Sequence, residues 1–205
     1  MVDRANDVID RLEALDKTVI NASAFRILLE DLHARDLTQV AEPHVASITM
    51  VRAGILRAAL GSVMSCLDRA DPRGNRASIG QILERLNDSA LVTFFLKPGQ
   101  SSGPTFAALE RAKRDYRVVI GGQLFEAGKQ LRDRQIAHTL IKCEPIPEVT
   151  YQTIGGLHGA AVRLATVLFR VCNQPPPEFI DQAENLSRHA KVFWDTYFGG
   201  MSLTA

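Results

Sequence analysis

The chain of 205 residues contains 46% hydrophobic residues, and 24 basic against 23 acidic side chains give it a formal net charge of +1. This length and apolar content are enough for a real core, which excludes a disordered tail. The balanced charge excludes a global attraction to nucleic acid or an anionic membrane, so any anion site must come from a local cluster.

The cysteines and the amino terminus indicate a cytoplasmic protein. Cys66, Cys143 and Cys172 are widely spaced and form neither a CxxC pair nor a zinc pattern, so we expect reduced thiols buried by packing. Residues 1–7 are charged with no apolar signal core behind them, and no stretch of 18 residues lacks charge. We therefore expect a protein that is neither exported by that route nor spans a membrane.

The first half of the chain predicts helices. Apolar residues recur at helical spacing from residue 7 to about residue 32, which indicates one or two amphipathic helices. Pro43 opens a second, nearly continuous apolar pattern that ends at the turn-forming residues 71–75 and indicates a buried helix. Ser78 is a suitable N-cap for a shorter helix, although Gly80 weakens its start.

A long helical pattern dominates the middle of the chain. It runs from Phe106 to about Leu140, and the glycines at 121–122 are a place where it can bend or divide. Residues 98–104 are rich in proline, glycine and serine and predict the clearest loop. Only residues 91–95 resemble a strand.

The fold class follows from these patterns. Two more helical patterns cover residues 149–171 and, after the prolines at 175–177, residues 178 to about 198. We predict an all-α fold, a single domain over residues 1–205 built as a bundle of five to seven helices, with a long helix that ends near residue 140.

Chemically useful side chains gather where that long helix ends. Residues 131–139 read LRDRQIAHT and combine two arginines, a carboxylate and a histidine. An imidazole titrates near neutral pH, and forked guanidinium donors fit a phosphate. In an ideal helix Arg134 and His138 share a face, whereas Arg132 lies about 120° from His138. Arg132 joins such a site only if the helix end unwinds or a second subunit completes it.

Local charge adds to this signal. Seven basic residues between residues 111 and 134 are offset by three acidic ones, which leaves +4 in that region. A local basic stripe attracts a polyanion when the total charge cannot. We therefore expect Arg117, Lys129 and Arg134 to contact an anionic substrate.

The stretch 131–139 resembles the mark of the HEPN superfamily, in which an arginine and a polar residue precede a histidine at this spacing. It is most similar to the U-type abortive-infection branch, with its Arg-polar-basic-x-x-Ala-His stretch and comparable size. The specific match covers about nine residues, and the helical layout supports it over roughly residues 106–198. The resemblance implies a helical bundle that dimerises so that two motifs face one cleft.

The resemblance also implies an activity. Active members are metal-independent RNases without a cofactor, often toxins or antiphage effectors, and a toxin of this kind has a cognate antitoxin as a partner. By position, His138 would handle the proton of the attacking ribose hydroxyl or of the leaving oxygen, Arg132 would stabilise the phosphate, and Asp133 would orient one of them. Two His138 side chains within about 10 Å across a symmetric interface would flank one phosphate.

A noncatalytic helical module that binds nucleotides or proteins is the alternative. Some members of the family lack nuclease activity, and basic side chains near a helix carboxyl end are favourable in any protein. A second pair at similar spacing, Arg26 and His33, fits an ordinary helix surface, so the spacing alone is not informative.

Other motifs favour packing over chemistry. The five histidines are dispersed and no HExxH occurs, so we expect no metal site. The glycine-rich residues 155–159 lack a Walker lysine and a preceding strand, which predicts close helix packing with His158 as a packed histidine. The aromatic residues of the last helix predict a core or dimer interface rather than a base-stacking surface; they are Phe193, Trp194, Tyr197 and Phe198.

Overall fold

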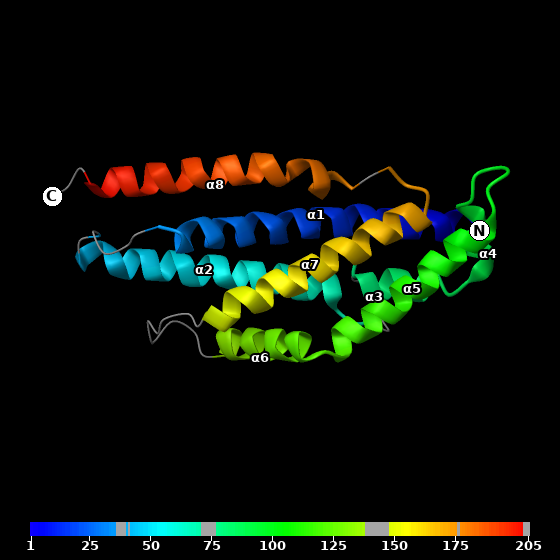
Figure 1. Cartoon of the computed structure of the whole chain (residues 1–205), viewed down its shortest axis with the longest axis horizontal. Helices are drawn as coiled ribbons and strands as arrows, with labels where there is room; N and C mark the ends of the chain where they lie inside the picture. The colour runs from blue at the N-terminus through cyan, green and yellow to red at the C-terminus, as the bar shows by residue number, and fades with distance from the viewer. Residues whose placement is uncertain (36–39, 41, 71–76, 138–147, 176, 203–205) are drawn as a thin grey trace.

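The structure is a computed structural model that describes residues 1–35, 40, 42–70, 77–137, 148–175 and 177–202, without the side chains of 42–43, 133–137, 148–150, 180 and 200–202. Over these residues the chain forms α-helices and no strand (Figure 1). The all-α prediction is therefore confirmed. The described part contains eight helices, slightly more than the five to seven expected.

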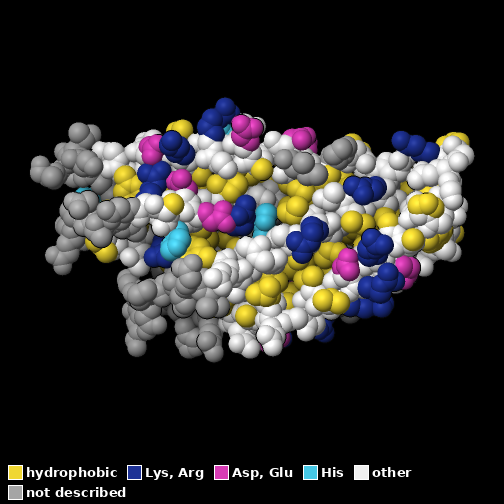
Figure 2. Space-filling view, viewed as in Figure 1, with side chains coloured by type: hydrophobic (Ala, Val, Ile, Leu, Met, Phe, Trp, Pro, Cys, Tyr) yellow, Lys and Arg dark blue, Asp and Glu magenta, His cyan; other side chains and the backbone are white. Residues whose placement is uncertain are grey.

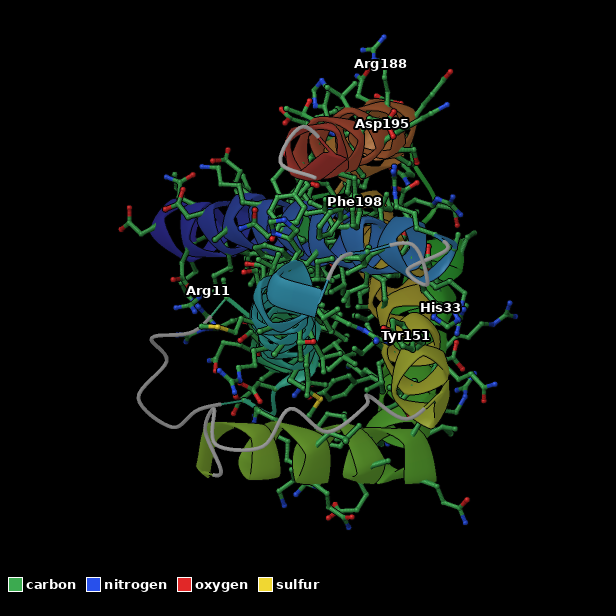
Figure 3. The ribbon with its side chains drawn as sticks, turned by 90° about the vertical axis from the view of Figure 1, so that its left-hand side faces the viewer. Arg11, His33, Tyr151, Arg188, Asp195 and Phe198 are labelled. Atoms are coloured by element: carbon green, nitrogen blue, oxygen red, sulfur yellow. The ribbon has the colours of Figure 1, made fainter. Side chains whose placement is uncertain are left out.

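The helices stack in layers. From one edge of the molecule to the other, Figures 1 and 3 show α8, then α1, then α2 beside α7, and finally α6. The elements are α1 (Val2–His33), α2 (Glu42–Leu67), α3 (Ile79–Arg85), α4 (Ser89–Phe94), α5 (Ser102–Gly121), α6 (Gln123–Ala137), α7 (Glu148–Val171) and α8 (Glu178–Ser202). The helix α1 packs against α2, α7 and α8, so it is the centre of the bundle.

The core explains why α1 is one helix rather than two. Val8, Leu12, Leu15 and Val19 are at most 1% exposed, and buried side chains continue at helical spacing to Leu32. Spacings of three and four residues place these side chains along one stripe. Since the stripe has no interruption, the helix is continuous.

The long helix predicted to end near residue 140 is two helices. Gly122 has an extended backbone (φ −85°, ψ 159°), so α5 ends before it and α6 begins after it. A Cβ atom at Gly122 would lie 3.1 Å from the carbonyl oxygen of Val118 and 3.3 Å from that of Val119, which is too close for most side chains. The glycine pair thus lets the chain turn sharply, and the described part of α6 ends at Ala137.

Two short segments differ from the sequence prediction. The strand-like residues 91–95 fall on helix α4 and its C-cap; the carboxylate of Asp88 caps this helix by accepting a hydrogen bond from the Ala90 N–H at 2.9 Å. The predicted loop is shorter than expected because α5 already begins at Ser102. Pro104 fits this first turn, where a backbone N–H has no partner within the helix.

The start of α3 was predicted correctly. Ser78 is its N-cap, and the Ser78 hydroxyl accepts a hydrogen bond from the Gln81 N–H at 3.3 Å. This bond satisfies one of the backbone donors that a helix start leaves unpaired. The turn predicted at residues 71–75 lies outside the described residues.

Gly80 allows α3 to approach the end of α2. A Cβ atom at Gly80 would collide with the Tyr116 hydroxyl and would lie 2.7 Å from the carbonyl oxygen of Asp68 and 3.0 Å from the backbone nitrogen of Ala70. The Tyr116 hydroxyl itself donates to the carbonyl oxygens of Leu67 and Asp68, at 3.2 and 2.9 Å. The glycine that weakens the helix start in sequence terms is therefore required by packing.

Two helices are long and apolar enough to span a membrane. By length and composition alone, His44–Leu67 and Tyr151–Val171 could cross one, and 39% and 56% of their most apolar windows are buried inside the molecule. Core helices of soluble proteins pass the same test, so this is a weak indication. The predicted cytoplasmic location stays a prediction.

We expect the substitution Gly80→Ala to destabilise the protein by about 2 kcal/mol or more, because backbone atoms cannot move aside for the new methyl group. Urea unfolding followed by circular dichroism measures this change. Gly54→Ala is the matched control, since a Cβ atom at Gly54 of α2 would meet nothing within 4 Å. Removing a glycine from that helix interior should stabilise by about 0.5–1 kcal/mol. Equal stability of the two variants would contradict the packing role of Gly80.

Candidate functional site

The candidate site is built on α6, which is seated against two core helices. A Cβ atom at Gly128 would lie 2.7 Å from Leu157 Cδ1 of α7 and 3.0 Å from Met64 Sδ of α2. Phe125, on the same side of α6, is only 7% exposed. Figure 3 shows α6 lying across the edge of the layer that α2 and α7 form. The glycine therefore lets the backbone of α6 pack closely against the ends of the Leu157 and Met64 side chains.

Arg132 follows Gly128 by one helical turn and therefore lies on the same face of α6. Its Nη1 atom is 3.7 Å from Oδ1 of Asp68, the residue directly after α2. The two side chains are 29% and 18% exposed, respectively. The guanidinium thus lies at the boundary between α6 and the end of α2, with part of its surface open to solvent.

The remaining members of the predicted motif are only partly described. Asp133 and Arg134 belong to the last turns of α6, but their side chains are outside the described part. His138 lies outside the described residues altogether. The structure therefore brings Arg132 together with Asp68, while the relation of Arg132 to His138 stays a prediction.

The basic stripe is divided between two helices. Arg111, Arg114 and Arg117 are exposed on α5, whereas Lys129 is exposed on α6, beyond the turn at Gly122. On the face drawn in Figure 2, Lys and Arg side chains are interspersed with acidic and hydrophobic ones. The predicted RNA-binding residues Arg117 and Lys129 are accessible but do not belong to one straight row.

The pKa of Glu110 on α5 is lowered by the cationic side chains around it. The Nζ atom of Lys113 donates to Oε1 of Glu110 at 2.8 Å. This hydrogen bond is the main cause of the lowered pKa of Glu110, with further attraction from the charges of Lys113, Arg114 and Arg117. The exposed side of α5 is therefore locally cationic, as the sequence predicted.

His158 is a packed histidine, as expected. It lies within α7, and its Nε2 atom is 2.7 Å from Oγ of Ser23 on α1. The Ser23 hydroxyl donates its proton to the carbonyl oxygen of Val19 at 2.9 Å. Since a hydroxyl has one proton, Ser23 accepts from Nε2–H, so the imidazole does not activate the serine as a base. Burial, and secondarily the charge of Arg26, lowers the pKa of His158 to about 4.

The glycine-rich residues 155–159 form part of helix α7 and not a phosphate-binding loop. Gly156 provides the close packing that we predicted, because a Cβ atom there would lie 3.1 Å from Leu124 Cδ1 of α6. Gly155, in contrast, has nothing within 4 Å of a Cβ position. Only one of these two neighbouring glycines is therefore needed for packing.

Three helices contribute to a cluster that the sequence did not reveal. The rings of His33 (α1) and Tyr151 (α7) are stacked, with centroids 4.8 Å apart and an interplanar angle of 29°, and Figure 3 shows them together. The Arg52 Nε–H of α2 donates to the Tyr151 hydroxyl at 2.8 Å. His33 is an exposed side chain, as predicted, but its partners lie too far away in sequence for any local pattern to indicate them.

The aromatic residues of α8 divide between core and surface. Trp194 is 0% exposed, and its indole N–H donates to the carbonyl oxygen of Leu28 at 2.9 Å. Together with Leu32 and Ile48 it forms a small second core between α8, α1 and α2. Phe193 is 45% exposed. The predicted core role is confirmed for Trp194, and an interface role of Phe193 stays a prediction.

The described thiols are unreactive. Cys66 and Cys172 are buried, and burial raises the pKa of each to about 12. This confirms their packing role, because the nucleophilic thiolate is not populated near neutral pH. Cys143 lies outside the described residues. Within the described part, no group of three or more His, Cys, Asp or Glu side chains could hold a metal ion.

Comparisons of the chain with protein-family models, with curated proteins and with solved structures gave no match. The resemblance of residues 131–139 to the HEPN motif therefore stays a prediction.

We expect stability to fall in acid because of His158. Its pKa is about 4 in the folded protein, against 6.5 for an ordinary histidine, so only the unfolded chain binds a proton between these values. Its contribution is complete above pH 6.5 and is lost as the pH falls toward 4, by up to about 3 kcal/mol. Urea unfolding at pH 7.5 and pH 5 measures the loss.

The variant His158→Gln keeps an N–H donor for Ser23 but cannot titrate, so it should remove most of this pH dependence. His189→Gln, at an exposed position of α8, is the matched control and should retain it. The same pH dependence in both variants would show that the acid sensitivity comes from another group.

Proposed function

We propose that this protein is a metal-independent endoribonuclease of the HEPN kind that acts as a homodimer through Arg132 and His138. The observation that best supports the proposal is the placement of Arg132. Its helix packs on two core helices at Gly128, and its guanidinium is 29% exposed and lies 3.7 Å from the carboxylate of Asp68. A partly exposed cation on a helix that packs on the core is suited to a phosphate.

The chemistry divides between proton transfer and charge stabilisation. His138 removes the proton of the ribose 2′-hydroxyl, whose oxygen bonds to the adjacent phosphorus to give a 2′,3′-cyclic phosphate. The bond from phosphorus to the 5′ oxygen breaks, and that oxygen takes a proton from the protonated His138 of the partner subunit. Arg132 donates hydrogen bonds to the phosphate oxygens, where negative charge increases in the transition state. Asp133 orients one of these two groups. None of these steps requires a metal ion.

Ideal helix geometry supports a homodimer. If the helix continued to residue 138, Arg132 and His138 would lie about 120° apart, so one subunit would not present both to the same phosphate unless the helix end unwinds. A second subunit related by two-fold symmetry supplies the missing group. The motifs of the two subunits then face one cleft.

The basic residues near the motif fit an RNA substrate. Arg117 and Lys129 are exposed and, with Arg134, provide phosphate contacts along the strand. A cytoplasmic RNase of this kind acts as a toxin or antiphage effector, and a cognate antitoxin restrains it.

A noncatalytic module that binds nucleotides or proteins is the second candidate. The observation that favours it is the carboxylate of Asp68, which already serves as a counter-ion for Arg132. In that case the Arg/His stretch would act only as a binding surface.

The experiment is an RNA cleavage assay in EDTA with tRNA and a structured RNA. We expect cleavage by the wild type, and a loss of about a hundredfold or more in rate for Arg132→Ala and for His138→Ala, since each removes a group that acts in the transition state. Chelation excludes metal-dependent contaminating nucleases.

The control is the pair Arg188→Ala and His189→Ala. These residues are exposed on α8, and Figure 3 shows Arg188 at the outer edge of the molecule. Both variants should cleave like the wild type. Absence of cleavage by a folded wild type that still binds RNA would favour the noncatalytic module, and unchanged cleavage in the Arg132 and His138 variants would reject the proposed site.

A further inference from the structure

We infer that Asp68 is an anion gate for Arg132: its carboxylate occupies part of the guanidinium surface that a phosphate uses, and thereby weakens phosphate binding. The inference rests on the proposed function, in which the phosphate belongs to RNA. It adds a residue outside the motif, from the segment directly after α2, that sets the affinity of the site.

The geometry is that of a loose pair. The 3.7 Å between Arg132 Nη1 and Asp68 Oδ1 exceeds the 2.7–3.2 Å range of an N–H···O hydrogen bond. Both side chains are partly exposed, and ion pairs in such surroundings contribute little to stability. A carboxylate and a phosphate present similar oxygen acceptors to a guanidinium, so one can replace or share the place of the other.

The two charges are held near each other by the backbones that carry them. The Tyr116 hydroxyl donates to the carbonyl oxygens of Leu67 and Asp68, which fixes the end of α2. Gly128, one turn before Arg132, packs closely against the side chains of Met64 in α2 and Leu157 in α7. These contacts place the backbones of Asp68 and Arg132 near each other.

An incoming phosphate meets a like charge at this position. A phosphate in contact with Arg132 comes within several ångströms of the Asp68 carboxylate, and the carboxyl end of α2 adds partial negative charge of its own. At that separation and in a largely aqueous environment, one unit charge changes the dissociation constant by roughly three- to tenfold. The charge of Asp68 thus lowers the affinity of the Arg132 site for phosphate.

The experiment compares four proteins: the wild type, Asp68→Asn, Arg132→Ala and the double variant. RNA affinity is measured by fluorescence anisotropy in the His138→Ala background, where the RNA stays intact. Independently of RNA, inorganic sulfate is titrated against the wild type and Asp68→Asn while the Nε–Hε signal of Arg132 is followed by NMR. Asparagine keeps the size of the side chain, removes its charge and replaces one acceptor oxygen by an NH2 group.

The matched control is Asp195→Asn. Asp195 of α8 pairs with Arg35 at 2.9 Å, and Arg35 keeps a second carboxylate partner in Asp31. This variant changes the net charge by the same amount without touching Arg132. It therefore separates a local effect at Arg132 from a general gain in attraction for anions.

We expect Asp68→Asn to tighten both RNA and sulfate binding roughly three- to tenfold, with no gain in the Arg132→Ala background and none for Asp195→Asn. Unchanged affinity for both ligands, or an equal gain without Arg132, would overturn the gate, and the proposed RNase would stand if the wild type still cleaves RNA. Tighter sulfate binding at Arg132 in a protein that neither cleaves nor binds RNA would support the gate and reject the proposed function.

Discussion

The position of the candidate site depends on the close packing of α6 against α2 and α7 at Gly128. Without a Cβ atom at Gly128, the side chains of Leu157 and Met64 come within van der Waals contact of the α6 backbone. This contact sets where Arg132 lies one turn later, and hence its distance to Asp68. A larger residue at position 128 would have to displace the ends of the Leu157 and Met64 side chains, in the layer against which the helix carrying the motif packs.

Glycines have two unlike roles in this bundle. Gly80 and Gly128 lie where helices approach too closely for a side chain, whereas Gly54 and Gly155 have nothing within 4 Å of a Cβ position. The sequence does not distinguish the two groups, because each glycine lies inside an apolar helical pattern. Whether a side chain fits at the glycine depends on the atoms that pack against it, and these come from a distant part of the chain.

The sequence predicts the features that depend on residues close together in the chain, and not those that join distant segments. The cap at Ser78 depends on near neighbours, and the local pattern predicted it. Local patterns also indicated the stripe of α1 and a break at residues 121–122, but they left open one helix or two at the first place and a bend or a division at the second. The apolar residues 91–95 are too few for periodicity to separate strand from helix. The pairing of Arg132 with Asp68, and the stack of His33 on Tyr151, join distant segments, so no local pattern indicates them.

The central claim is that two motifs face one cleft in a dimer, and the distance between the two residues at position 138 tests it most directly. In a Cys143→Ser background, the variant His138→Cys is treated with a bismaleimide that spans about 10 Å, the separation of two groups that flank one phosphate. The remaining Cys66 and Cys172 are buried. If the two motifs face one cleft, His138→Cys gives a covalent dimer, whereas Ser187→Cys on the exposed side of α8 gives none. A protein that sediments as a dimer but is not crosslinked at position 138 would contradict it.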